Sequence, residues 1–221
     1  MAMRKITKSA AVVASLVILT AGFSTIAQAA PTKSPAKVNC KKTNAKGHSV
    51  KNITPPEVKT PFKNRTFTLK TNCGEIVIEA DGVKAPVTVI ALAALANGGF
   101  FNQTICHRLT TNNIYVLQCG DPTATGSGGP NFSYRDENLP QAAQANYPAG
   151  VVAMANSGAN TNGSQFFIVY EDTSLPPSYT IWGKVTKGLE IVQSIAKEGV
   201  INGKSDGLPK RTIAIEKVKV R

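Results

Sequence analysis

The chain has 221 residues, with 25 lysines and arginines against 13 aspartates and glutamates, which gives a formal net charge of +12. Hydrophobic residues make up 42% and charged residues 17%, a composition typical of globular proteins that argues against a disordered chain. The length allows one or two domains. No basic stripe interleaved with aromatic residues occurs, so no nucleic-acid partner is expected. We expect a solvated basic surface with weak, salt-sensitive adhesion to acidic material such as anionic cell-envelope polymers.

The first 29 residues have the parts of a secretory signal peptide. A basic start and an apolar stretch lead to the small residues Ala27-Gln28-Ala29, after which we expect cleavage. An uncleaved membrane anchor is the rival interpretation, but Ser15 and Thr20 dilute the apolar stretch. No cysteine lies at the cleavage point, which argues against a lipoprotein. The sequence therefore predicts a secreted or extracytoplasmic protein.

The segment at 30–62 is rich in Lys, Pro, Thr and Asn and has almost no apolar periodicity. This composition predicts a flexible basic tether. We expect one folded domain at 63–221, and a monomer is the default expectation.

The first half of that domain alternates strand and helix patterns. Two alternating runs within 67–79 predict a β-hairpin that turns at 71–74. Residues 84–97 predict a helix, because Pro86 suits a first turn and Gly98-Gly99 supplies a stop. Its apolar residues occur nearly all round, so this helix should be largely buried. Residues 100–121 predict two strands around a turn at 110–113, followed by a long irregular loop at 122–148 that is expected to be functional.

The second half predicts a hairpin whose strands, 151–155 and 166–170, bracket a polar loop. A loop at 171–178, a strand at 179–185, a helix at 189–197 and a last strand at 211–220 follow. Short strands with one helix early and one late predict a mainly β fold. We expect a closed antiparallel barrel capped at both ends by the helices.

The four cysteines form an even set in a chain expected to be exported, and three pairings are possible. Cys106 and Cys119 lie on the two strands around the turn at 110–113, where antiparallel neighbours come within bridging range. Cys40 and Cys73 remain, and their bond would attach the tether to the first hairpin. We predict both bonds; four free buried thiols are the alternative. A metal site is not expected, because only His48 and His107 are available and no CxxC occurs.

The polar loop of the second hairpin belongs to the most specific motif of the chain. MANSGANTNGSQFFI, at 154–168, closely resembles the signature segment of cyclophilins, the cyclosporin-binding peptidyl-prolyl cis–trans isomerases. CHRLTTNNIYVLQCGDPTATGSGG, at 106–129, and TIWGKVTKGLEIVQSI, at 180–195, match the family in the right order. The resemblance covers roughly residue 67 to the last residue. It implies a closed eight-stranded barrel with two helices, and prolyl isomerisation without a cofactor.

The resemblance implies three catalytic residues. Arg108 would contact the prolyl nitrogen, Gln118 would hold Arg108 and the substrate, and the backbone of Asn156 would anchor the substrate carbonyl. A guanidinium suits this role because it stays charged and presents a rigid fork of donors. The proline pocket and the adjoining groove are implied at Tyr115, Val116, Met154, Ala155, Gln165, Phe167, Leu175 and Tyr179.

Several positions depart from the family pattern. The turn after Arg108 is two residues longer than in the best-known members, and Tyr115 replaces the common pocket phenylalanine. Residues 173–176 occupy the stretch where many members carry the tryptophan that grips cyclosporin, and Tyr179 falls where many have a histidine. We therefore expect catalysis to survive and cyclosporin binding to be weak.

Three functions are weighed. The first is an isomerase acting on proline-containing peptides and unfolded exported proteins, whose folding prolyl isomerisation slows. The second is a non-catalytic proline-peptide adaptor or adhesin of the same fold, and the third is a basic envelope-binding protein that depends on the tether. His107 is expected to be structural. Ser164 lies in no nucleophile elbow and has no convincing His/Asp partners, so hydrolase activity is not expected.

Overall fold

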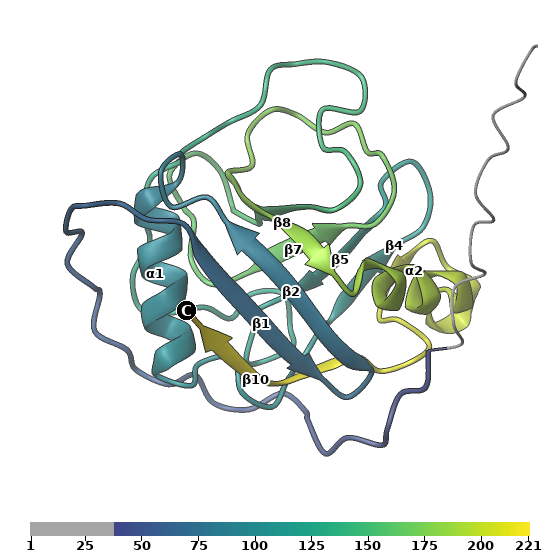
Figure 1. The fold of residues 1–221 in the computed structure, drawn as a ribbon. Coiled ribbons are helices and arrows are strands. Elements are labelled where there is room, and N and C mark those ends of the chain that lie inside the picture. Colours follow the sequence, from purple (N-terminus) through teal and green to yellow (C-terminus); the bar gives the residue numbers. More distant parts are fainter. Residues whose placement is uncertain (1–37) are drawn as a thin grey trace, which may run out of the picture. The chain divides into compact units, whose positions relative to one another are not determined.

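The computed structural model describes residues 38–221, and the leader expected at 1–29 lies outside them. Within the described residues, ten strands form one curled antiparallel sheet, with a helix on either side of it (Figure 1). The strands are β1 (Arg65–Thr71), β2 (Gly74–Ala80), β3 (Thr104–Ile105), β4 (Arg108–Thr110), β5 (Val116–Cys119), β6 (Val151–Met154), β7 (Phe166–Val169), β8 (Ile181–Lys187), β9 (Asp206–Gly207) and β10 (Ala214–Val220). The helices are α1 (Pro86–Asn97), α2 (Leu189–Glu198) and the short 3₁₀ turn η1 (Ile201–Gly203). None of the helices in this part of the chain is both long enough and apolar enough to cross a bilayer.

The sheet has the strand order β3-β10-β1-β2-β8-β6-β7-β5-β4-β9. The ladder of residues 38–221 ends at β3 and β9, so the expected closed barrel of eight strands is not confirmed. The number of strands is ten instead of eight partly because Cys106 and His107 interrupt the strand expected before the 110–113 turn. These two residues also lead directly from β3, at one edge, to β4, next to the other edge. Because so short a link joins them, the sheet must curl until its two edges lie close together.

The main core fills the inside of the curl. Trp182 of β8 is its largest fully buried side chain. The Trp182 ring meets Phe67 of β1 and Phe166 of β7 edge to face, with ring centroids 5.4 and 5.7 Å apart. Burial of each such side chain contributes about 1.5–3 kcal/mol. Because the apolar residues of β1 and β2 alternate, one face of the first hairpin packs into this core, opposite β7.

Helix α1 is capped from a distant loop. Ala85, its N-cap residue, provides no side-chain hydrogen bond. The carboxylate of Glu137 accepts hydrogen bonds from the backbone N–H of Val87 (3.2 Å), the backbone N–H of Thr88 (3.0 Å) and the Thr88 hydroxyl (3.0 Å). These donors otherwise lack an intrahelical acceptor, and a carboxylate also suits the positive end of a helix. The long loop at 122–148 is thereby fixed to α1.

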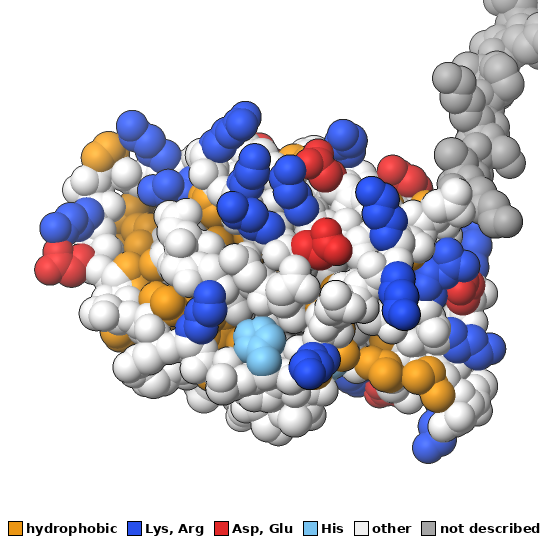
Figure 2. Space-filling model, turned by 90° about the horizontal axis from the view of Figure 1, so that it is seen from below, with side chains coloured by type: hydrophobic (Ala, Val, Ile, Leu, Met, Phe, Trp, Pro, Cys, Tyr) orange, Lys and Arg blue, Asp and Glu red, His pale blue; other side chains and the backbone are white. Residues whose placement is uncertain are grey.

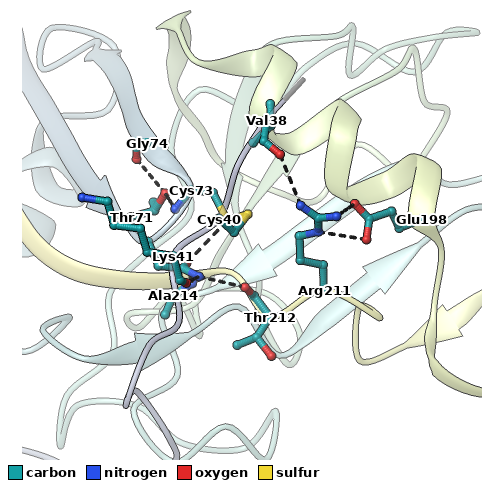
Figure 3. The surroundings of a disulfide bond; sticks show 11 residues. Val38, Cys40, Lys41, Thr71, Cys73, Gly74, Glu198, Arg211, Thr212 and Ala214 are labelled. Atoms are coloured by element: carbon teal, nitrogen blue, oxygen red, sulfur yellow. Dashed lines mark hydrogen bonds and ion pairs between the residues drawn. A yellow bond between two sulfur atoms is a disulfide. The ribbon is translucent and has the colours of Figure 1, made fainter. Parts of the chain in front are cut away.

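The residues that precede β1, 38–62, are called the strap here. They contain no helix or strand, but a disulfide between Cys40 and Cys73 fixes them to the β1–β2 turn (Figure 3). Beside it, the backbone N–H of Lys41 donates to the carbonyl oxygen of Asn72 (2.8 Å), and the Asn72 amide donates back to the carbonyl of Lys41 (3.0 Å). One of the two predicted cysteine pairings is thus present, with backbone pairing next to it.

Arg211 and His48 hold further parts of the strap. The Arg211 guanidinium donates to the carbonyl oxygen of Val38 (3.2 Å) and pairs with Glu198 at the end of α2 (2.7 Å), as Figure 3 shows. The backbone N–H of His48 donates to the carbonyl oxygen of Pro122 (2.9 Å). The stretch expected as a tether is therefore attached to the domain at several points along 38–48.

Candidate functional site

Four adjacent strands carry one row of side chains across the outer face of the sheet. Arg108 of β4 is paired with Gln118 of β5, Gln118 with Phe167 of β7, and Phe167 with Ala153 of β6. Directly opposed residues of antiparallel strands point to the same face. Arg108 and Phe167 are two strand spacings apart, about 10 Å between backbones, which their side chains can span. The register thus places Arg108 and Phe167 on the same face of the sheet, with Gln118 between them.

Arg108 is held by two partners. Its Nε and Nη2 donate to the two carboxylate oxygens of Asp206, at 2.8 Å each, and its Nη1 donates to Oε1 of Gln118 at 3.2 Å. The hydrogen bond to Asp206 raises the pKa of the guanidinium, and it holds the pKa of the Asp206 carboxyl below its ordinary value. The side chains of Arg108 and Asp206 are 43% and 51% exposed, so the pair contributes little to stability. Its main effect is to fix the direction of the guanidinium.

Two glutamines continue this network. Nε2 of Gln118 donates to Oε1 of Gln165 (2.8 Å), and Nε2 of Gln165 donates to the carbonyl oxygens of Gly126 and Gly128, at 2.9 Å each. Asp121 shapes the loop that carries these carbonyls, because one of its oxygens accepts the N–H groups of Gly126 (2.7 Å) and Gly128 (3.1 Å). Burial alone would raise the pKa of Asp121, yet hydrogen bonds from this loop bring it below its ordinary value. The carboxylate is therefore a fixed charge that organises the loop.

An apolar cluster lies next to Phe167, separate from the main core. Its members come from β5, β6, β7 and the start of β8 and from the loops and turns next to these strands, and we call it the second cluster. The rings of Phe167 and Tyr179 meet edge to face, with centroids 5.5 Å apart. The buried members are Val116, Tyr147, Val151, Ala153, Phe167 and Val169, and Ile114, Ala155, Leu175, Tyr179 and Ile181 pack against them half-buried. Five of the predicted pocket residues, Val116, Ala155, Phe167, Leu175 and Tyr179, therefore lie together.

Two predicted pocket residues lie elsewhere. Met154 is fully buried in the main core, because it alternates with Ala153 and points to the other side of β6. Tyr115 packs against the main core and Tyr170, with ring centroids 6.0 Å apart, and lines a separate hollow beside α2. In the longer turn after Arg108 the neighbouring Ile114 reaches the second cluster instead.

A groove of about 260 Å³ adjoins this face. Gln118, Ala155, Asn156 and Gln165 form one wall, and residues of the loops at 126–133 and 157–164 form the rest. Nδ2 of Asn156 donates to the carbonyl oxygen of Ser178 (2.8 Å), which fixes this residue against the following loop. Within residues 38–221 the backbone N–H and C=O of Asn156 take part in no hydrogen bond. They are free to pair with an extended peptide.

The second disulfide joins the link just before β4, the strand of Arg108, to the end of β5, the strand of Gln118. Cys106 and Cys119 are bonded, as the sequence predicted, with Cα atoms 4.0 Å apart. His107 lies between Cys106 and Arg108 and is 9% exposed, and neither ring nitrogen has a hydrogen-bond partner among the described residues. Burial lowers its pKa, so the imidazole is neutral at pH 7. A neutral, buried ring of this kind fits the structural role expected for it.

The sequence reasoning missed Asp206, Tyr147 and Ile114. Asp206 reaches the site through β9, a two-residue strand that pairs with β4, and it lies 98 positions from Arg108. Tyr147 comes from the long irregular loop. Its hydroxyl donates to the carbonyl oxygen of Tyr179 (3.1 Å) and accepts the N–H of the same residue (3.0 Å). No local pattern indicates either contact, because both join segments that are far apart in the sequence and meet only in the folded chain.

A curled antiparallel sheet between two helices, with a clamped arginine beside an apolar cluster on its outer face, is the architecture of the cyclophilin class. Residues 66–220 match the family model described as cyclophilin type peptidyl-prolyl cis-trans isomerase/CLD. The chain belongs to this family.

Named relatives and solved structures agree with this assignment. A protein of Mycobacterium leprae named "Probable peptidyl-prolyl cis-trans isomerase B" is 42% identical over 197 residues, which cover 83% of this chain and 67% of the relative. Its Mycobacterium tuberculosis counterpart is 40% identical over 81% of this chain and 63% of its own length, so the chain spans only about two thirds of these relatives. A crystal structure of a Cryptosporidium parvum cyclophilin type isomerase is 29% identical, with a TM-score of 0.60, over 72% of this chain and 98% of that one. The same protein was also crystallised in the presence of the dipeptide Ala-Pro, and that structure has a TM-score of 0.59.

Proposed function

We propose that this protein is a peptidyl-prolyl cis–trans isomerase that accelerates the folding of exported proteins. The observation that carries the proposal is the position of Arg108, which is clamped by Asp206 and Gln118 at the edge of the second cluster. Family membership and the solved relative crystallised with Ala-Pro support the same activity. Proline-containing segments of unfolded chains are the proposed substrates.

The chemical task requires no nucleophile. An Xaa–Pro bond rotates slowly because the twisted state loses amide resonance. An acceleration of about 10⁵ requires about 7 kcal/mol of stabilisation that acts on the twisted state more than on either planar isomer. In that state the prolyl nitrogen regains a lone pair and becomes a hydrogen-bond acceptor. A fixed donor near the nitrogen and an anchor on the preceding carbonyl therefore lower the barrier.

Arg108 retains the donors that this task needs. A guanidinium has five N–H groups, and the contacts with Asp206 and Gln118 use three of them. One N–H on Nη1 and one on Nη2 remain for the substrate. Because Asp206 engages two nitrogens at once, the plane of the guanidinium cannot turn freely, and the remaining donors keep their direction. Asp206 thus acts as a positioning residue.

The second cluster and the groove provide the remaining binding elements. The pyrrolidine ring packs on Phe167, within the apolar hollow completed by Val116, Ile114, Leu175 and Tyr179. Asn156 pairs with the substrate through its free backbone groups, and Ala155 and Gln165 line the continuation of the peptide in the groove. Met154 supports this face from the core side only.

Export of the protein remains part of the proposal. It rests on the signal peptide expected from the sequence of residues 1–29, and the two disulfides support an oxidising environment outside the cytoplasm.

The test is the rate of cis–trans isomerisation of an Xaa–Pro peptide. Arg108→Ala should abolish most of the acceleration while peptide affinity, measured separately, is largely kept. Arg108→Lys should retain little of the acceleration, because an ammonium group lacks the planar fork of donors. Arg135→Ala is the matched control, since Arg135 is an exposed arginine whose side chain is 70% accessible, and it should leave the rate unchanged. If Arg108→Ala isomerises the peptide as fast as the wild type, the adaptor reading is correct and the enzyme proposal is wrong.

A further inference from the structure

Eight basic side chains on one side of the molecule have no ion-pair partner among residues 38–221. Four come from the strap and four from the segment that contains β10, and we call them the basic track. They are Lys41, Lys42, Lys46 and Lys51 of the strap, and Lys210, Lys217, Lys219 and Arg221. All eight are exposed. Figure 2 shows basic side chains spread over this face, seen from below the view of Figure 1.

The fold, not the sequence, brings these two groups together. The amide of Asn72 donates both to the carbonyl oxygen of Lys41 (3.0 Å) and to that of Thr212 (3.1 Å), so the strap begins beside the start of the β10 segment. Ten residues later Lys51 lies with the end of β10 in a common hollow. The strap therefore runs alongside β10 in the same direction, as Figure 1 shows along the lower edge of the sheet.

Two hollows mark the ends of the track. The one at the start measures about 550 Å³ and is lined by Lys41, Lys42, Lys210 and Arg211. The one at the end measures about 570 Å³ and is lined by Lys51, Lys217, Lys219 and Arg221. No Asp or Glu side chain of the described residues lines either hollow. Residues 213–216 separate the two hollows along the chain, so the distance from Thr212 to Lys217 is about 16 Å.

We propose that the basic track binds a linear, flexible phosphodiester polymer that carries no bases. The separation of the two hollows favours a long polyanion over a single phosphate group. No aromatic side chain lines either hollow, so neither offers the stacking that single-stranded nucleic acid uses. Carboxylates are scarce nearby, since 38–53 contains none and 210–221 contains only Glu216.

This site is independent of the proposed isomerase. None of the eight track residues lines the groove beside Arg108 or belongs to the second cluster. A polymer bound on the track would therefore leave the isomerase face open to a protein chain. The protein would be concentrated along the polymer while it acts on its substrates.

The experiment measures binding of fluorescent poly(glycerol phosphate) chains to the full folded chain over a range of salt concentrations. Two double variants remove two charges each, Lys41→Gln/Lys42→Gln from the strap and Lys217→Gln/Lys219→Gln from β10. Lys184→Gln/Lys187→Gln is the matched control, because it removes the same charge from β8, three strands from β10. A further variant, Cys40→Ala/Cys73→Ala, keeps every charge but releases the start of the strap.

Each track variant should lower the slope of log affinity against log salt by about 1.4, the contribution of two phosphate contacts on a single strand. The β8 control should leave the slope unchanged. The cysteine variant, with folding verified by the fluorescence of the buried Trp182, should weaken binding although its net charge is that of the wild type. Equal losses in all three lysine variants would show that net charge alone acts, and would overturn the proposal. Tighter binding of single-stranded DNA or of anionic lipid vesicles than of the polymer would also overturn it.

Discussion

The disulfide between Cys40 and Cys73 allows a quantitative test of the strap. Replacing both cysteines by alanine avoids leaving a hydroxyl at Cys73, which is 7% exposed. The bond closes a loop with a sequence separation of 33 residues. For such a loop, the restriction of the unfolded chain corresponds to about 3.7 kcal/mol at 25 °C. We expect the double variant to lose about this much free energy of unfolding.

The assay is equilibrium unfolding in urea without reductant, followed by the fluorescence of the single tryptophan, Trp182. With a denaturant dependence of about 2 kcal/mol per molar urea, the midpoint should fall by nearly 2 M. The folded variant should keep its isomerase rate, because no strap residue lines the groove or the second cluster. A loss below about 1 kcal/mol would refute the reasoning, since the strap would then restrict the unfolded chain very little.

Three further predictions concern single side chains. Asp206→Asn should reduce kcat/KM about tenfold, because Arg108 loses its fixed direction, and the thermal midpoint should hardly move. Since the pKa of Asp206 lies below the ordinary 3.8, the carboxylate stays ionised above that pH, and the contribution of this pair to wild-type activity should not change with pH there. It should be lost only as the pH drops through the lowered pKa. Glu137→Ala should cost about 1–2 kcal/mol of stability, because the first turn of α1 loses its acceptor. Gly120→Ala should cost about 2 kcal/mol or more, since Gly120 has φ +88° and an added Cβ would run into the carbonyl oxygen of Ser164.

For each of these three predictions, one experimental result would contradict it. An Asp206→Asn enzyme as fast as the wild type would mean that Gln118 alone directs the guanidinium. If Asp206→Glu recovers part of the lost rate without a change in stability, the positioning role is supported. Thermal unfolding measures the other two variants. A stable Glu137→Ala protein would show that another group caps α1, and an unperturbed Gly120→Ala protein would show that the chain around Ser164 moves aside.

Much of the fold follows from local patterns in the sequence. The first hairpin, α1 and the last strand were predicted within a few residues, because strict alternation and clear turn and stop residues mark them. Both disulfides were also predicted, since the strand positions of Cys106 and Cys119 leave only one partner for Cys40. These features are determined by residues that are close in the sequence, so composition and spacing can predict them.

Strand alternation explains why Tyr115 and Met154 lie apart from the other predicted pocket residues. In β5 the side chains of Val116 and Gln118 share one face, so Tyr115 and Leu117 must point to the other. The same alternation in β6 separates Ala153 from Met154. A motif match assigns residues by position along the chain, whereas the side on which a residue lies depends on the period of the strand.

Contacts between residues that are far apart in the sequence could not be predicted from such local patterns. Asp206 meets Arg108 only because β9 pairs with β4, and nothing in the residues around Asp206 indicates that pairing. The strap was predicted as a tether because its polar composition offers little apolar surface to bury. The strap is attached to the domain by a disulfide and by backbone hydrogen bonds, and amino-acid composition alone does not predict these contacts.

The place of β10 has a consequence for how this chain matures. It comes last in the sequence, yet it lies between β1 and β3. Until its residues have left the ribosome and any export machinery, the sheet lacks an interior strand and two unpaired edges stay open to aggregation. The sheet can therefore be completed only after residues 214–220 have been made, and loss of this strand would separate β3 from β1.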